Sequence, residues 1–311
     1  MSINFKGRVA IVTGAGGGLG RQHALALAAR GAKVVVNDLG GARDGTVGSL
    51  DSGLVSAAQA VVNEIKAMGG EAIANGASVT DYVAVQAMVQ QAIDTWGRVD
   101  ILINNAGILR DKSFAKMEIA DFELVMDVHL MGAVHCCKAV WPHMNAQKYG
   151  RIVMTTSSSG LYGNFGQSNY GAAKMALVGL MQTLSIEGAK NDIRVNCLAP
   201  TAATRMTEGL MSEDVLQALK PEAVVPAMLV LASADAPNRT VLCAGAGTFE
   251  AANITLTQGI YLGMDSDTPE QLAERLSEVI SRNGDIVPQS GAAQGTNEIQ
   301  KAMAKVAAEI A

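Results

Sequence analysis

The chain has few aromatic residues and cysteines, and its positive charges are not clustered. Its four cysteines include two adjacent ones and no Cys-x-x-Cys pair, so they indicate neither a disulfide framework nor a metal site. We interpret them as small core residues of a reducing compartment. A formal net charge of −5, with no Lys/Arg cluster, gives no support for a nucleic-acid-binding surface.

Long apolar runs and targeting signals are missing as well. No window of about eighteen residues is both apolar and uncharged, so we expect no membrane span. The N-terminus carries a charge at Lys6 and reaches glycine too early for a signal peptide. The last residues do not form a Ser-Lys-Leu peroxisomal signal, and we therefore expect a cytoplasmic protein.

Glycine and aliphatic residues, by contrast, are abundant. The 311 residues include 33 glycines, and 49% hydrophobic residues against 17% charged ones are typical of a compact globular protein. Short, fully apolar runs alternate with helical patterns, which indicates a parallel sheet buried on both faces. We predict an α/β fold over residues 1–245, a doubly wound Rossmann-type sheet of about seven strands. A C-terminal extension over residues 246–311 is predicted to form a hairpin and two helices.

A glycine-rich turn follows the first apolar run, residues 9–12, in the pattern GxxxGxG. Its glycines let the backbone approach a pyrophosphate, and the N-terminus of the following helix supplies oriented N–H groups. Asp38 ends the second apolar run, where a carboxylate accepts hydrogen bonds from a ribose diol and repels a 2′-phosphate. The pattern predicts a site that prefers NAD to NADP, formed by Gly14, Gly16, Gly18, Leu19, Gly20 and Asp38. Glycine turns also occur without nucleotides, and Arg21 and Arg43 are the nearest cations that favour NADP.

Other polar segments follow the ends of predicted strands. Asn104 to Gly107 follows the apolar run 99–103, and Pro200 to Arg205 follows the run 193–198. Ligands of doubly wound sheets bind at this edge, although an Asn-Gly strand exit is also a common structural feature. The polar loop 40–53 lies near the adenosine end, where it is either a flap or an inert surface insertion.

The stretch 150–174 carries the residues best suited to proton transfer. Tyr170 and Lys174 are four residues apart on a predicted helix and so share one face. A nearby ammonium favours the phenolate, which makes Tyr170 a candidate general base. Ser157 precedes this helix, and its hydroxyl is placed to orient the same substrate oxygen. A solvated Tyr/Lys pair is the alternative interpretation of the spacing taken alone.

These motifs, in this order and spacing, resemble the short-chain dehydrogenase/reductase family over about residues 5–245. Within that family, the stretches VVVNDLGG, NNAGILRDKSF, YGNFGQSNYGAAK and ALKPE resemble the (3R)-hydroxyacyl-CoA dehydrogenase units of type 2 peroxisomal multifunctional enzymes. The resemblance implies that Tyr170 is the acid or base, Ser157 positions the carbinol oxygen, and Lys174 holds the nicotinamide ribose. His129 occupies the position where the family commonly has asparagine, with an implied role in proton transfer that this substitution puts in question.

The resemblance also implies a larger set of cofactor-binding residues. In addition to the glycine turn and Asp38, these are Ser78, Val79, Asn105, Ala106, Gly107, Tyr170, Lys174, Pro200 and Thr204. Two positions depart from the family pattern: Ser78 replaces an aspartate, and Thr201 replaces a glycine. The departure at Thr201 weakens the implied contact of Thr204 with the carboxamide.

Three functions are compatible with the sequence. The first is hydride transfer between NAD and a secondary alcohol, most concretely (3R)-hydroxyacyl-CoA to 3-oxoacyl-CoA. The second is a 17β-hydroxysteroid dehydrogenase of the same family, and the third is a non-catalytic NAD-binding protein. Five apolar residues either line an acyl or steroid slot or belong to the core: Leu161, Phe165, Met206, Leu210 and Met211. Family analogy predicts a homo-oligomer, a dimer or a tetramer, with helix 169–187 as a candidate interface.

Overall fold

The computed structural model describes residues 3–42, 44–46, 56–203 and 213–310. The chain divides into two compact units, Met1–Ala252 and Asn253–Ala311. The first unit holds the sheet and all the predicted site residues. Thr204, Met206, Leu210 and Met211 lie outside the described residues.

One eight-stranded sheet forms the centre of the first unit, in the order β3-β2-β1-β4-β5-β6-β7-β8. Seven strands are parallel, and β8 pairs with β7 in the antiparallel direction. The strands are β1 (Val9–Thr13), β2 (Lys33–Asn37), β3 (Glu71–Asn75), β4 (Ile101–Asn104), β5 (Gly150–Thr155), β6 (Ile193–Thr201), β7 (Val241–Gly245) and β8 (Thr248–Ala252). The strand order reverses between β1 and β4, and the crevice at their carboxyl ends is the usual ligand site of such sheets. The predicted doubly wound fold is confirmed.

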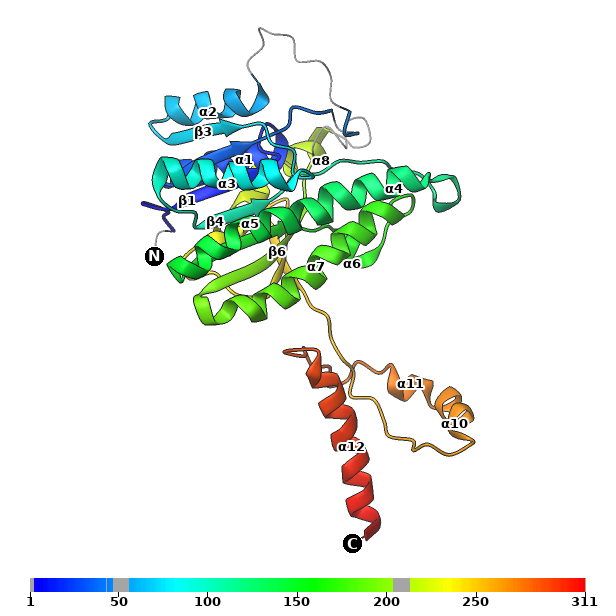
Figure 1. Cartoon of the computed structure of the whole chain (residues 1–311). Coiled ribbons are helices and arrows are strands. Elements are labelled where there is room, and N and C mark those ends of the chain that lie inside the picture. The colour runs from blue at the N-terminus through cyan, green and yellow to red at the C-terminus, as the bar shows by residue number, and fades with distance from the viewer. Residues whose placement is uncertain (1–2, 43, 47–55, 204–212, 311) are drawn as a thin grey trace. The chain divides into compact units, whose positions relative to one another are not determined.

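Helices cover both faces of this sheet, as Figure 1 shows. One apolar cluster joins the sheet to α1 (Gly18–Ala29), α2 (Ala57–Ala67) and α9 (Val225–Ala232). The second cluster joins the opposite face to α3 (Tyr82–Trp96), α5 (Gly132–Gln147) and α7 (Ser168–Gly188). Burial on both faces explains why β1, β2 and β4 are apolar except at their end residues and do not alternate with polar residues.

The helical stretch between β4 and β5 contains a proline and one irregular turn. Proline commonly kinks or ends a helix, but Pro142 lies inside α5, which continues past it to Gln147. The irregularity is instead a π-helical turn, Asp127–Met131, between α4 (Ile119–Met126) and α5. Among the described residues, Ile119–Gln147 is also the one helical stretch long and apolar enough to cross a membrane, with 44% of the tested window buried. Its apolar side chains pack in the core of the unit, as those of a central helix do.

The hairpin after residue 245 also begins earlier than predicted. β7 is its first strand, and Ala246 and Gly247, both with positive φ, form the turn to β8. This added strand explains why the sheet has one strand more than the predicted number. The second unit contains α10 (Thr268–Glu274), α11 (Leu276–Val279) and α12 (Ala292–Ile310), with a short antiparallel bridge between Leu256 and Ile286. The remaining short elements are η1 (Phe114–Lys116), α6 (Ser158–Tyr162), η3 (Ala189–Asn191), α8 (Glu213–Ala218) and η4 (Pro221–Val224).

Candidate active site

The glycine turn after β1 has the backbone that an anion site requires. Gly14 and Gly18 have φ of 61° and 53°, a region that favours glycine. A Cβ on Gly20 would lie 2.1 Å from the Gly14 carbonyl oxygen, so only glycine lets helix α1 pack this closely on the turn. No described side chain caps α1, whereas Ser56 and Asp81 cap α2 and α3. The first N–H groups of α1 are therefore available to a phosphate.

Asp38 lies against this turn at the carboxyl end of β2. One carboxylate oxygen accepts the Gly16 N–H and the other the Gly40 N–H, each at 2.8 Å. A Cβ on Gly16 would come within 2.8 Å of the carboxyl group, which explains the glycine there. Each carboxylate oxygen can accept a further hydrogen bond, as a ribose diol requires. The turn, the uncapped helix and this carboxylate together fit the pyrophosphate and adenosine ribose of a dinucleotide.

Asn105 supports the turn from the neighbouring strand. Its side-chain amide donates to the carbonyl oxygens of Thr13 and Gly14, both at 3.0 Å. The Thr13 hydroxyl accepts from the backbone N–H groups of Asn105 and Ala106. The side-chain N–H groups of Asn105 are thus used to position the turn, and Thr13 is a positioning residue that the sequence analysis missed. A threonine at the end of β1, directly before Gly14, was the signal available.

Ser78 and Val79 follow β3 at the same edge of the sheet. The Ser78 hydroxyl bonds that of Thr80 at 2.8 Å, and the Val79 carbonyl is 2.9 Å from the Nδ1 atom of His135. Asn37 holds this segment next to β2, since its side-chain amide donates to the Ala77 carbonyl. Ser78 is therefore placed on the adenosine side, near the end of the strand that carries Asp38.

Ser157, Tyr170 and Lys174 converge beyond β5. Ser157 is the N-cap of α6, where its hydroxyl accepts the Ser159 N–H at 3.2 Å and lies near enough to the Tyr170 phenol to lower the pKa of that group. The Lys174 Nζ atom lies 5.4 Å from the centre of the Tyr170 ring and donates to the Thr155 carbonyl at 2.6 Å. Lys174 is 3% exposed, because Gly160 lets α6 pack directly on it. The spacing of Tyr170 and Lys174 thus places both at the end of β5 beside the serine.

The electrostatics of this group differ from the sequence prediction. Burial raises the pKa of Tyr170 above its ordinary value, and the hydrogen bond from Ser157 opposes that rise. Burial also lowers the pKa of Lys174 to about 7. The prediction that Lys174 lowers the Tyr170 pKa is therefore wrong for the chain by itself, because desolvation dominates both groups. An additional positive charge near the phenol is needed to favour phenolate.

His129 lies beside Tyr170, in the π-helical turn. The two rings meet edge to face with centres 5.2 Å apart, and the His129 Nε2 atom is 2.8 Å from the Ile108 carbonyl oxygen. Burial and the charge of Lys174 lower the pKa of His129 to about 3, so its ring is neutral at physiological pH. A Cβ on Gly107 would lie 2.3 Å from this ring, which is why glycine ends the Asn-Asn-Ala-Gly motif.

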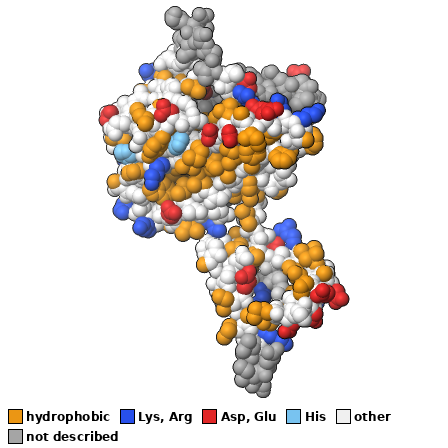
Figure 2. All heavy atoms as spheres, turned by 45° about the vertical axis from the view of Figure 1, so that its right-hand side comes forward, with side chains coloured by type: hydrophobic (Ala, Val, Ile, Leu, Met, Phe, Trp, Pro, Cys, Tyr) orange, Lys and Arg blue, Asp and Glu red, His pale blue; other side chains and the backbone are white. Residues whose placement is uncertain are grey.

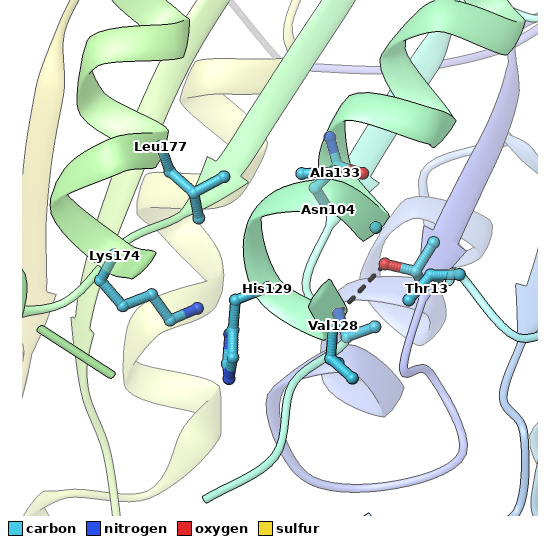
Figure 3. A pocket seen from close by; sticks show the side chains of 10 residues that line it. Thr13, Asn104, Val128, His129, Ala133, Lys174 and Leu177 are labelled. Atoms are coloured by element: carbon cyan, nitrogen blue, oxygen red, sulfur yellow. Dashed lines mark hydrogen bonds between the residues drawn. The ribbon is translucent and has the colours of Figure 1, made fainter. Parts of the chain in front are cut away.

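A small cavity at the end of β4 is lined by residues that include Asn104, His129 and Lys174. It measures about 10 Å³, comparable to the space one water molecule needs, and Figure 3 shows the Lys174 side chain extended toward His129. The His129 Nδ1 atom and the Asn104 Oδ1 atom are buried there without a hydrogen-bond partner. Unpaired polar atoms around a space of this size are suited to a bridging water. The sequence analysis placed Asn104 at this edge of the sheet but gave its side chain no role.

The remaining predicted residues lie around this group. Pro200 lies in β6, opposite Ala244 of β7. Leu161 is half-buried and packs against the core, whereas Phe165 is 91% exposed. All four cysteines are free thiols, and in the described part of the chain no group of three His, Cys, Asp or Glu side chains is placed to hold a metal ion.

Comparison with known proteins places this site in a family. A model described as short chain dehydrogenase matches residues 8–214, and the chain belongs to this family of oxidoreductases that act on CH–OH groups. Peroxisomal multifunctional enzyme A of Dictyostelium discoideum is 48% identical over 291 residues, which cover 93% of this chain and 64% of that protein. The structure of full-length peroxisomal multifunctional enzyme type 2 from Drosophila melanogaster matches with a TM-score of 0.80 and 37% identity. The match covers 98% of this chain and 51% of that one.

A third match comes from a steroid enzyme. The structure of 7α-hydroxysteroid dehydrogenase, complexed with NADH and 7-oxo glycochenodeoxycholic acid, has a TM-score of 0.69 and 29% identity. The match covers 78% of this chain and 95% of that one. The present chain therefore spans less than two thirds of its multifunctional relatives and nearly all of a single-unit dehydrogenase.

Proposed function

We propose that this protein is an NAD-dependent dehydrogenase that converts (3R)-hydroxyacyl-CoA to 3-oxoacyl-CoA. The observation that carries the proposal is the convergence of Ser157, Tyr170 and Lys174 at the sheet edge that also holds the glycine turn and Asp38. The likeness to the peroxisomal multifunctional enzymes supports the proposal. The motifs that resemble the (3R)-hydroxyacyl-CoA dehydrogenase units of such enzymes support the substrate.

Each residue of the site has its own role in the reaction. The glycine turn and Asp38 would hold the dinucleotide, whose oxidised nicotinamide would supply the hydride acceptor and a positive charge that favours ionisation of a phenol. Tyr170 takes the hydroxyl proton as the C–H bond breaks and the carbonyl forms, which makes it the general base. Ser157 orients the substrate oxygen toward Tyr170. Lys174 is held at the Thr155 carbonyl, and His129, being neutral, accepts or donates hydrogen bonds without carrying charge.

A substrate panel tests this proposal directly. Purified protein is mixed with NAD and either medium- or long-chain 3-hydroxyacyl-CoA esters of both configurations or 17β-hydroxysteroids, and NADH absorbance is recorded. We expect the (3R) esters to be oxidised fastest. Faster oxidation of steroids would replace the proposal by the second function, which the likeness to a hydroxysteroid dehydrogenase favours. NADH binding without any turnover would indicate the non-catalytic function.

The preference for NAD is expected to depend on Asp38. Asp38→Ala removes the carboxylate that would repel a 2′-phosphate and bond the ribose, so the ratio of kcat/KM for NAD over NADP should fall about tenfold to one hundredfold. Steady-state kinetics with both cofactors measure the ratio, with Asp81→Ala, which removes a helix cap instead, as the control. Wild-type protein that is already faster with NADP would contradict the assignment.

A homo-oligomer and a cytoplasmic location stay predictions. Figure 2 shows apolar side chains gathered in a band on one face of the first unit, which is consistent with contact between subunits. Helix α7, the predicted interface, exposes Met175 and Ile186.

A further inference from the structure

Arg110 joins three segments that are distant in the sequence. Its Nε atom donates to the carbonyl oxygen of Asp44 at 2.7 Å, and its Nη1 atom bonds the Asp121 carboxylate at 2.8 Å. Its own backbone carbonyl accepts a hydrogen bond from the side chain of Asn169 at 3.0 Å. The guanidinium therefore links the segment after Asp38 to the start of α4, and its backbone is fixed next to Tyr170.

The segment after Asp38 is folded into a turn that fits this link. We call residues 40–42 and 44–46 the adenosine-side turn. The Ala42 N–H bonds the Thr46 carbonyl, and the Asp44 carboxylate accepts from the N–H and hydroxyl of Thr46. Gly45 has φ of 86°, and a Cβ there would lie 3.2 Å from the Cδ1 atom of Ile108. The turn therefore packs on the residues that follow the Asn-Asn-Ala-Gly motif.

Asn169 connects the backbone of Arg110 to the backbone of Tyr170. Asn169 is fully buried, and its side-chain oxygen accepts the Tyr170 N–H at 2.7 Å while its amide holds the Arg110 carbonyl. Ile108, which contacts the turn at Gly45, also bonds His129 and packs in one cluster with Tyr170. Two routes thus connect the adenosine-side turn with the catalytic tyrosine, one through Arg110 and one through Ile108.

An open pocket lies between the turn and the residues beside Arg110. It measures about 320 Å³ and is lined by Ala42, Asp44, Thr46, Leu109 and Asp111. The Asp111 carboxylate accepts a hydrogen bond from the side chain of Gln167 at 2.7 Å, so the pocket reaches the N-terminal end of α7, the helix that carries Tyr170. The adenosine-side turn, which follows Asp38, forms one wall of this pocket.

We propose that Arg110 is a positioning residue that fastens the adenosine-side turn over the pocket beside Tyr170. One turn then serves both the adenosine end of the cofactor site and the wall of the substrate pocket. This inference deepens the proposed function and rests on it for the identity of the substrate. A planar guanidinium is required, because a single ammonium cannot bond the Asp44 carbonyl and the Asp121 carboxylate in the same geometry.

The test compares Arg110→Met and Arg110→Lys with Arg98→Met. Arg98 forms a similar ion pair, with Asp100, before β4 at the opposite edge of the sheet. We expect both Arg110 variants to raise the KM for (3R)-hydroxyacyl-CoA about tenfold to one hundredfold, since small misplacements have effects of that size. Both variants should also weaken NADH binding in a fluorescence titration, and the amides of Ala42, Asp44, Gly45 and Thr46 should exchange faster. Arg98→Met should leave all three measurements unchanged.

A double-mutant cycle identifies the turn as the element that responds. Gly45→Ala strains a positive-φ position and presses on Ile108, so it should reproduce the Arg110→Met effect on KM. Because both changes act through one turn, their combined effect should be smaller than the product of the separate effects. Effects that multiply would overturn the inference.

Other outcomes are equally decisive. Full rescue by lysine, or a lower Tm with unchanged KM and NADH affinity, would reduce Arg110 to a charge or stability role. If Arg110→Met does not fold, the lysine variant carries the test alone. Failure of the wild-type protein to oxidise acyl-CoA would defeat the proposed function, while NADH affinity and amide exchange would still decide the role of Arg110.

Discussion

Tyr170→Phe is expected to lower kcat for alcohol oxidation by about a thousandfold, within the range that general acid–base catalysis contributes, while NADH affinity stays close to that of the wild type. The phenol hydroxyl is the group that accepts the substrate proton, and phenylalanine keeps the ring against His129. Steady-state kinetics and a fluorescence titration measure the two effects. Tyr149→Phe is the matched control, because the Tyr149 ring lies between Arg8 and Arg151, beside the first residue of β5 and away from the site.

The same tyrosine predicts how activity depends on pH. Oxidation requires phenolate, and burial raises the Tyr170 pKa, so the rate of oxidation should increase with pH until the phenol of the cofactor complex is ionised. This dependence should disappear from the residual activity of Tyr170→Phe. A phenylalanine variant that oxidises a good substrate at the normal rate would show that another group takes the proton.

Lys174→Met is expected to lower kcat by about a hundredfold or more, the scale of a lost catalytic positioning group, and to raise the Tm. Burying the lysine lowers its pKa from 10.5 to about 7, which corresponds to a cost on the order of 4 kcal/mol at pH 7. Methionine avoids that cost but leaves the Thr155 carbonyl without its donor, at about 1–3 kcal/mol. The variant should therefore be more stable at pH 7 by about 1–3 kcal/mol.

The stability difference between the lysine and methionine forms should itself depend on pH. The folded-state pKa of Lys174 is lowered, so the cost of burial is absent above pH 10.5, grows as the pH falls toward 7, and is complete below 7. Denaturant unfolding of both proteins from pH 6 to 10, within that window, measures the difference. A methionine variant that is less stable at pH 6 would mean that the hydrogen bond to Thr155 outweighs desolvation.

Local patterns account for the parts of the site that the sequence predicted. The glycine turn is specified by residues within one strand-turn-helix unit, and Tyr170 and Lys174 share a face through helical spacing alone. Asp38 directly follows β2. The parallel arrangement of the strands therefore predicts that Asp38 lies at the carboxyl edge of the sheet.

Contacts between distant segments account for what the sequence did not predict. The position of Arg110 depends on Asp44 and Asp121, and the neutral state of His129 depends on burial against Tyr170. The depressed phenol pKa was inferred from a neighbouring charge without knowledge of burial, which proved the larger effect. Pro142 has a strong local preference for breaking a helix, but the packing of α5 accommodates it.

The π-helical turn Asp127–Met131 has a consequence for how α4 and α5 relate to each other. A π turn adds one residue to a helix, which rotates everything after it by about 100° relative to an unbroken helix. The apolar stripe that α4 presents to α7 and the stripe that α5 presents to the sheet are therefore out of phase along the chain. Because of the extra residue, α4 can pack beside the catalytic residues while α5 packs in the core, although the two segments form one continuous helical stretch.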